Sequence, residues 1–301
     1  MRFRADVTTP LTFLHVVQTF NKLQQRCIMK FTPEDMHMIC SNDISEGGVQ
    51  VWSQIKVESL FTEYRIQSNA NNQITFSLST DALLVALRSA SSYSSSSATS
   101  GADIVMKLAK KQDQAVLTFE ISGQSRSGKP VKITHDIRIE LMRPEEVDKL
   151  AEPMCPEPQV QIILPPLAKM RTVVERLRVH SDLILFEANN SGSIQLTASN
   201  DTVSVKVEWH NLRNPPTAKV PSSQDPETAS QALNERDPDE KHGVLVAFKS
   251  FQKFLNSHQL STTTIACVCR NHALILYVYI GEVTDSGGVL TFYLPAVIDG
   301  D

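Results

Sequence analysis

The chain repeats one order of predicted secondary-structure elements in each half, and this repeat limits the possible folds more than any other feature. Apolar and polar residues alternate with period two over most of the 301 residues, and Gly, Asn and Ser separate the alternating runs. This pattern is typical of many short antiparallel strands. Apolar residues at spacings of three and four instead predict amphipathic helices at residues 10–26, 81–90, 165–180 and 247–258. We therefore expect an α+β protein of two similar domains.

The strands expected from the alternation form one group in each half. In the first half they are residues 1–7, 27–31, 37–40, 48–57, 62–67, 73–79, 104–109, 114–122 and 131–141. In the second half they are residues 159–164, 183–188, 192–199, 202–209, 243–246, 263–269, 273–280 and 289–294. The third helix is expected to begin at Pro165, because proline is favoured at the first helical position.

Segments of unusual composition predict the domain boundaries. Residues 142–158 contain four prolines and seven charged residues without a usable period, which predicts an extended connector between the halves. The domains are then residues 1–141 and residues 159–301. Residues 214–241 are rich in Pro, Ser, Asp and Glu and predict a flexible insertion, and the serine-rich residues 89–100 predict a loop.

Positive charge is concentrated on the four predicted helices of an otherwise acidic chain. The helices carry nine Lys or Arg and two acids, a net of +7, whereas the whole chain has a net charge of −4. The remaining residues therefore sum to −11. A polyanion is the natural partner of such a surface, because like charges at helical spacing repel one another unless something neutralises them.

The helical cations lie mainly opposite or beside the apolar stripes. The candidate residues for contact with a polyanion are Lys22, Arg26, Arg88, Lys169, Arg171, Arg176, Lys249 and Lys253. A single helix of this kind is ordinarily a solvated surface helix, and that alternative stays open for each helix taken alone. Four together favour phosphate contacts. Without interleaved aromatic residues, such contacts hold a nucleic-acid backbone and do not read its bases.

The motifs that could carry enzyme chemistry lack the context that they need. Residues 123–129 match the start of a phosphate-binding loop, but Pro130 stands where a Ser or Thr would ligate magnesium. A strand pattern then follows where the motif requires a helix. His135 and Asp136 are neighbours in a predicted strand, so their side chains face opposite sides. We predict no catalytic residue, metal ligand or cofactor, and an NTPase using residues 123–129 is the less favoured alternative.

The cysteines and the apolar stretches of the sequence limit where in the cell the protein is expected. Five cysteines without paired zinc-site spacing indicate reduced thiols, as in a nuclear or cytosolic protein. The longest apolar stretch, residues 273–280, is too short to cross a bilayer, and the first six residues contain no apolar signal segment. We therefore expect no membrane association.

Short strings in both halves resemble one family of proteins. They are MRFRA at residues 1–5, GGVQVW at 47–52, THDI at 134–137, LPPL at 164–167, VVE at 173–175, EAN at 187–189 and NPP at 214–216. The duplicated halves, the connector and the basic helices resemble a DNA sliding clamp of the proliferating cell nuclear antigen type. The strings narrow the resemblance to the Hus subunit of the heterotrimeric DNA-damage checkpoint clamp, the nine-one-one clamp.

This resemblance implies a ring-shaped assembly. In the family, three subunits close head to tail with sheets outside and helices facing duplex DNA, so the eight candidate cations would line the hole. The strands at residues 131–140 and 202–209 would lie at the subunit edges. The implied partners are two other clamp-like subunits, double-stranded DNA bound without sequence specificity, a clamp loader, and checkpoint and repair proteins. The implied location is the nucleus.

The resemblance also implies a docking region for these proteins. Family partners dock near the connector, so residues 142–158 with Tyr293, Pro295 and Ile298 are the candidates, and ordinary packing of those three residues is the alternative. The predicted function is a non-enzymatic clamp subunit that encircles DNA at damage sites and recruits checkpoint signalling and repair proteins. A homotrimeric replication clamp is the alternative within the same fold.

Overall fold

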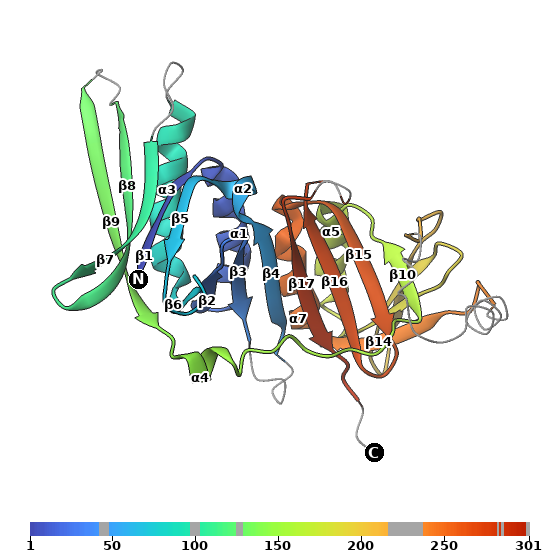
Figure 1. The fold of residues 1–301 in the computed structure, drawn as a ribbon. Helices are drawn as coiled ribbons and strands as arrows, with labels where there is room; N and C mark the ends of the chain where they lie inside the picture. The colour runs from blue at the N-terminus through green and yellow to red at the C-terminus, as the bar shows by residue number, and fades with distance from the viewer. Residues whose placement is uncertain are drawn as a thin grey trace.

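The structure is a computed structural model that describes residues 1–41, 48–96, 103–124, 129–215, 237–281, 283 and 286–298. It contains two similar units of strands and helices that lie side by side in one elongated molecule (Figure 1). Most of the predicted insertion, and the middle of the phosphate-loop match, lie outside the described residues.

The described residues of the first unit form nine strands and three helices. Its strands are β1 (Arg2–Val7), β2 (Arg26–Phe31), β3 (Asp35–Cys40), β4 (Gln50–Lys56), β5 (Phe61–Gln67), β6 (Ile74–Ser79), β7 (Asp103–Lys111), β8 (Gln114–Gln124) and β9 (Pro130–Leu141). Its helices are α1 (Pro10–Leu23), the short α2 (Val57–Leu60) and α3 (Thr80–Ser96). Buried and more exposed side chains alternate along strands such as β1 and β2, as the period-two pattern predicts.

The second unit follows a connector that contains one helical turn, α4 (Pro144–Val147). Its strands are β10 (Val160–Ile163), β11 (Leu183–Ala188), β12 (Ile194–Ser199), β13 (Ser204–Trp209), β14 (His242–Ala247), β15 (Ser261–Cys269), β16 (Ala273–Ile280) and β17 (Gly288–Pro295). Its helices are α5 (Leu167–Leu177) and α7 (Phe248–Leu255), which continues into the 3-10 turn η2 (Asn256–Gln259).

One antiparallel joint connects the sheets of the two units. The 13-stranded sheet has the order β10-β15-β16-β17-β4-β3-β2-β6-β9-β8-β7-β1-β5, and the 4-stranded sheet has the order β13-β12-β11-β14. Strand β17 pairs with β4 from Gly288 opposite Ile55 to Tyr293 opposite Gln50. The pairing makes one sheet continuous through the middle of the molecule (Figure 1).

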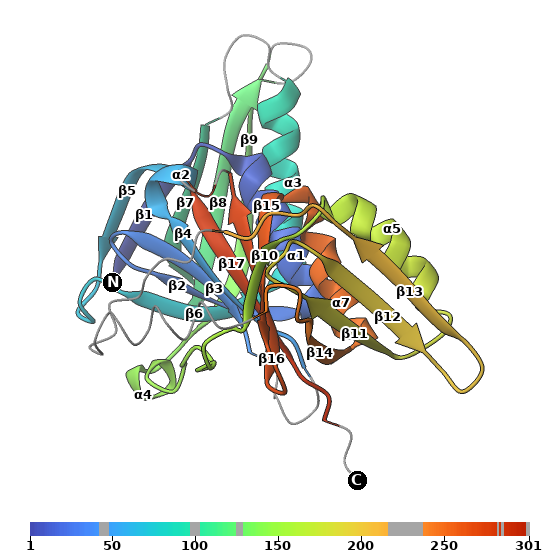
Figure 2. The ribbon, with the colours of Figure 1, turned by 90° about the vertical axis from the view of Figure 1, so that its right-hand side faces the viewer.

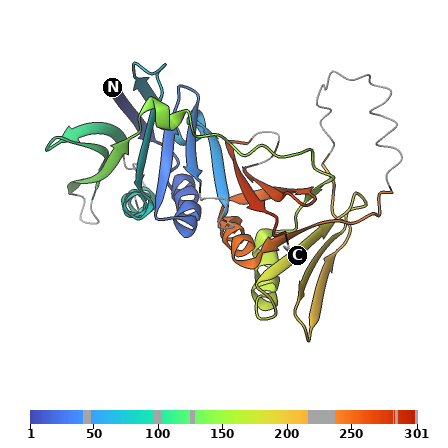
Figure 3. The same cartoon turned by 90° about the horizontal axis from the view of Figure 1, so that it is seen from below.

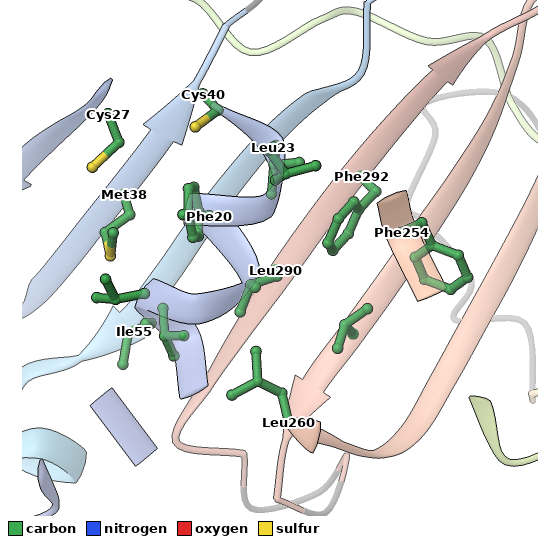
Figure 4. Close-up of a cluster of buried hydrophobic side chains, with 14 of the residues drawn as sticks. Phe20, Leu23, Cys27, Met38, Cys40, Ile55, Phe254, Leu260, Leu290 and Phe292 are labelled. Carbon is green, nitrogen blue, oxygen red and sulfur yellow. The ribbon is translucent and has the colours of Figure 1, made fainter. Parts of the chain in front are cut away.

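The hydrophobic core also crosses this joint. Phe20 and Leu23 of α1 lie near Leu290 and Phe292 of β17, and Phe254 of α7 packs on the other side (Figure 4). The rings of Phe254 and Phe292 meet edge to face with centroids 5.3 Å apart. Because these side chains are almost completely buried, the joint holds the helices of the two units in a fixed relation.

The connector packs against a second hydrophobic cluster on the sheet surface away from the helices. The buried members of the cluster are Ile265, Cys267, Cys269, Ala273, Ile275 and Tyr293. The connector is anchored where Cys269 Sγ donates to the carbonyl of Pro156 (3.4 Å) and where the Arg270 amide donates to Gln159 Oε1 (2.7 Å). The connector is therefore tied to the sheet at its C-terminal end.

Several predicted helix boundaries are wrong. α3 continues to Ser96, so residues 89–96 are helical and not a loop. Two of these serines donate to carbonyls within the helix: Ser91 to that of Arg88 at 3.1 Å and Ser92 to that of Ser89 at 2.9 Å. α5 begins at Leu167 with Pro166 as its N-cap, so Pro165 is not its first helical residue. The connector is not wholly extended either, because it contains α4.

The first helix is shorter than predicted. α1 ends at Leu23, and Gln24 already has extended backbone angles (φ −154°, ψ 147°). The chain turns there because Cys27 begins the buried series of β2. Arg26 therefore lies on a strand and not on a helix.

Candidate nucleic-acid interface

Four helices form a row on one side of the molecule. In the order α3, α1, α7 and α5 they follow a shallow curve, with most strands on its outer side (Figure 3). α1 packs against α3, α5 packs against α7, and η2 contacts α1 as well as α5 and α7. Figure 2 shows the small sheet alongside α5 and α7. Both units therefore contribute helices to one surface.

Each helix turns an apolar stripe toward the strands. The buried stripe of α5 is Leu167, Met170, Val174 and Leu177, and that of α7 includes Phe248, Phe251, Phe254 and Leu255. Thr19 of α1 is also buried and donates to the carbonyl of His15 at 3.0 Å. Because the stripes face the sheets, the opposite helix faces point away from the sheets on the same side of the molecule.

The exposed face of α5 carries the highest density of cations. Lys169 and Arg176 are exposed. Arg171 forms an ion pair with Glu175, with Nε and Oε1 2.8 Å apart, and this pair neutralises the acid of the helix. Arg178, just beyond the helix, donates from Nη1 to Gln252 Oε1 at 3.3 Å.

α7 presents one exposed and one half-buried lysine. Lys249 is exposed, whereas Lys253 is half-buried and its Nζ lies 3.5 Å from the carbonyl oxygen of Leu23. That carbonyl belongs to the last turn of α1, where the helix dipole favours a cation. Lys253 thus links the two units, and its ammonium group already has a partner within the chain.

The first unit contributes fewer cations to the row. Lys22 of α1 and Arg88 of α3 are exposed. Arg26, on β2, instead forms an ion pair with Glu140 (Nη2 to Oε2, 2.7 Å) and donates to Ser77 Oγ (2.9 Å). Partial burial lowers the pKa of His15 below its ordinary 6.5, so the imidazole adds little positive charge at pH 7.

Most of the predicted cations are brought together on the row. Within the described ranges, those with neither an ion-pair nor a hydrogen-bond partner are Lys22, Arg88, Lys169, Arg176 and Lys249. Asp81, the other acid of the helices, accepts a hydrogen bond from Asn21 Nδ2 at 2.8 Å. The row therefore offers unpaired positive charge, while both of its acids are engaged within the chain.

The three residues proposed for partner docking do not form one exposed surface. Tyr293 is only 8% exposed and donates from its hydroxyl to Glu152 Oε1 of the connector at 2.6 Å. Burial, helped by this hydrogen bond, raises the pKa of the Tyr293 phenol well above its usual range. Pro295 is half-buried at the end of β17, and Ile298 is 75% exposed. Tyr293 is therefore an ordinary packing residue, as the alternative interpretation expects. Of the three candidates, Ile298 is the one that a partner protein could reach.

Two of the strands with open edges are β13 and β9, in addition to β5, β10 and β14, which also end a sheet. Among the described strands, β13 is the end strand of the 4-stranded sheet and pairs with β12 alone. β9 pairs with β8 along most of its length, but with β6 only through Ile139, Glu140 and Leu141. The rest of β9 lacks a neighbour on that side among the described strands. These are the two strands that the family resemblance assigned to subunit edges.

The regions with possible enzyme chemistry have structural roles. Gly123 lies in β8 and Pro130 begins β9, and the two strands pair as a hairpin. Asp136 accepts hydrogen bonds from Lys111 Nζ and Thr118 Oγ1, both at 2.7 Å, and these lower the pKa of its carboxyl. Burial raises the pKa of the Cys40 thiol to about 12, so this cysteine is a poor nucleophile.

The described residues contain neither a metal-binding cluster nor a membrane-spanning helix. No group of three or more His, Cys, Asp and Glu side chains there is arranged to hold a metal ion. Within the same ranges, no helix combines the length and apolarity that crossing a bilayer requires.

The duplicated units, the outer sheets and the row of helices define the sliding-clamp class of folds. A crystal structure of the proliferating cellular nuclear antigen from Entamoeba histolytica matches this chain with a TM-score of 0.67. The match covers 98% of this chain and 99% of that one, at 15% sequence identity. The predicted α+β clamp fold is confirmed.

The sequence comparisons identify the family within that class. The model of the Hus1-like protein family matches residues 1–298, and the chain belongs to this family. Checkpoint protein hus1 of Schizosaccharomyces pombe is 31% identical over 99% of this chain and all of its own length. Checkpoint protein HUS1 of Homo sapiens is 26% identical over the same shares. The family is non-enzymatic, which confirms that expectation and disfavours the NTPase alternative.

Proposed function

We propose that this chain is one subunit of a heterotrimeric checkpoint clamp that encircles duplex DNA. One observation carries the proposal: helices from both units lie in a single curved row, and the face that they turn away from the sheets carries unpaired cations. Phosphates would neutralise that charge. Contacts of this kind hold DNA without regard to sequence, as a protein that slides along the duplex requires.

The cations differ in how directly they support DNA contact. Lys169, Arg176 and Lys249 in the second unit, with Lys22 and Arg88 in the first, are exposed and unpaired within the described residues. We assign these five the main role. Arg171 and Lys253 would contribute less because each already has a partner within the chain. Arg26, paired with Glu140, is the weakest candidate.

The joint inside the chain supplies a template for closing a ring. β17 is the last strand of the second unit, and β4 is the third strand after the first helix. In the same way, β9 is the last strand of the first unit, and β13 is the third strand after the first helix of the second unit. Both β9 and β13 have open edges. A copy of the β17·β4 pairing between β9 of one subunit and β13 of the next would join subunits head to tail. Such heterologous contacts close into rings when the rotation allows.

Membership of the family favours two different companion subunits over two copies of this chain. The relatives from Schizosaccharomyces pombe and Homo sapiens are named as checkpoint proteins. A homotrimeric replication clamp is the alternative with the same fold. In the proposed assembly the chemistry belongs to the recruited checkpoint and repair proteins, a clamp loader opens the ring, and the complex acts in the nucleus.

A native mass measurement on the complex purified through this subunit tests the proposed assembly. We expect one copy of this chain with one copy each of two different proteins of similar size. The purified chain alone should remain monomeric until those two proteins are added. A ring that contains only this chain would overturn the heterotrimer and support the replication-clamp alternative.

A further inference from the structure

A cluster of arginines lies on the outer surface of the first unit, away from the helix row. β5 is the end strand of the large sheet and pairs with β1, so that Arg4 stands directly opposite Arg65. Arg2 lies two residues along the same face of β1. On its other side β1 pairs with β7, and there Lys107 stands opposite Arg4. Three cations therefore occupy neighbouring positions across three adjacent strands.

The chain neutralises only part of this charge. Lys107 Nζ lies 2.6 Å from Glu120 Oε1, a close ion pair. Within the described ranges Arg4 reaches only Asp6, at 3.7 Å, and the Arg65 guanidinium lies 3.1 Å from the exposed carboxylate of Glu63. Arg2 has no partner within the residues that the structure describes. The pairs of Arg4 with Asp6 and of Arg65 with Glu63 are the more exposed ones, and exposed pairs contribute little to stability.

Like charges directly opposite one another in a sheet are destabilising. Arg4 and Arg65 are placed in this way by the register of β1 and β5, and Lys107 extends the row. A role in folding does not account for the arrangement, because it works against strand pairing. An external anion that bridges the guanidinium groups would convert the repulsion into binding.

The same arginines line a cleft at this edge of the sheet. Its volume is about 780 Å³, and Arg2, Arg4 and Arg65 line it together with Gln67 and Asn72. Its apolar lining consists of Phe3, Pro33, Tyr64 and Ile66. No aspartate or glutamate belongs to the lining. We call this site the arginine cleft.

We propose that the arginine cleft binds an acidic peptide segment of a partner protein, through clustered carboxylates or a phosphate group. All three lining cations are arginines, whose planar guanidinium forks hold carboxylate and phosphate oxygens in pairs. β1 buries Phe3 and Ala5 toward the helices, so Arg2 and Arg4 face the opposite way. The cleft is therefore separate from the proposed DNA-facing row.

The geometry favours a peptide over single-stranded nucleic acid. Nucleic acid without sequence preference is ordinarily held by aromatic faces on which bases stack. The only aromatic residues of the lining are Phe3, which is buried, and Tyr64. The Tyr64 ring already packs against Phe3 with centroids 5.6 Å apart, and its hydroxyl donates to the carbonyl of Thr32 at 2.6 Å. We therefore expect the arginines, and not aromatic rings, to recognise the ligand of the cleft.

Binding of labelled peptides to the full chain tests the proposal. The probes are a short acidic peptide with one phosphoserine, its unphosphorylated form, and a form with Gln and Asn in place of its acids, each followed by fluorescence anisotropy. We expect the two acidic forms to bind and the neutral form to bind at least about tenfold more weakly. The ratio of the two acidic forms distinguishes a phosphate from carboxylates as the preferred group.

Variants locate the binding to the cleft. The double variant Arg4→Gln, Arg65→Gln should weaken binding of the acidic probes by about tenfold or more. Its melting temperature should stay equal or rise, because the opposed charges are removed. The matched control is Arg270→Gln, an exposed arginine of the second unit outside the cleft, which should bind like the wild type.

Three results would overturn the proposal. They are equal binding of the acidic and neutral probes, equal loss in the control variant, and no measurable binding of either acidic probe. A single-stranded oligonucleotide that binds more tightly than the peptides, and loses affinity in the double variant, would reject a peptide as the ligand. None of these outcomes bears on the ring, because the arginine cleft lies on a different surface from the helix row.

Discussion

Replacing Lys169 and Arg176 by glutamine should make DNA binding less dependent on salt. Both side chains are exposed on α5 and have no partner in the described part of the chain, so each is free to neutralise one phosphate. For duplex DNA, log K falls by about 0.9 per unit of log salt for each phosphate neutralised. Loss of two contacts should therefore reduce the slope by about 1.8.

This difference is large enough to measure. Raising the salt concentration from about 50 to about 200 mM should weaken the DNA affinity of both proteins. With a slope difference of about 1.8, the loss of affinity should be about tenfold larger for the wild type than for the variant. The assay is an equilibrium titration of the purified complex with linear duplex DNA at several salt concentrations. Companion subunits are the same in both samples, so their contribution cancels in the comparison of slopes.

A matched control separates this effect from a general loss of charge. Lys56 and Arg270 are an exposed lysine and an exposed arginine that do not belong to the helix row. The variant Lys56→Gln, Arg270→Gln has the same change in net charge and should keep the wild-type slope. Identical slopes for wild type and the Lys169→Gln, Arg176→Gln variant would refute the assignment of α5 to the DNA surface.

Three further predictions concern stability and the connector. Tyr293→Phe removes the hydroxyl that donates to Glu152 of the connector at 2.6 Å, so the free energy of unfolding in urea should fall by about 1 kcal/mol. Trypsin should also cut the connector at Lys149 faster, and unchanged cleavage would contradict the anchoring role of Tyr293. Gly192→Ala should destabilise the fold by more than about 1 kcal/mol in the same assay, because φ is +85° and a Cβ would collide with the carbonyl oxygen of Leu212. The hydrogen bond from Lys107 lowers the pKa of Glu120 below its ordinary 4.5, so it stabilises the fold above that pH and is lost as pH falls through the lowered value. Lys107→Met should therefore flatten the acid side of a stability–pH curve, and an unaltered curve would reject the contribution of this pair.

The strands were predictable because burial imposes period two on the sequence. β11 and β16 begin and end where the alternation predicts. The missed elements are short or contradict local composition. α2 and α4 have four residues each, too few to display a helical period. Serines are only moderate helix formers, and the serine-rich composition therefore gave no signal that α3 continues past the buried Ala90 to Ser96.

The candidate site was predictable as a set of charges but not as a set of contacts. Helical spacing correctly placed Lys169, Arg176 and Lys249 on exposed helix faces. It could not predict that Arg26 would reach Glu140, because the two residues are far apart in sequence and meet only where β2 and β9 flank β6. Nor could spacing reveal the opposition of Arg4 and Arg65, which depends on strand register.

Site-specific photo-crosslinking to duplex DNA tests the central claim most directly, because it reports which face of the subunit the duplex meets. A photoreactive residue is placed at position 169 or 249 on the helix row, or at position 56 or 270 away from it, in the complex assembled on circular duplex DNA. We predict efficient crosslinks from positions 169 and 249 and few from positions 56 and 270. Crosslinks of equal yield from all four positions, or only from 56 and 270, would contradict a DNA-facing row of helices.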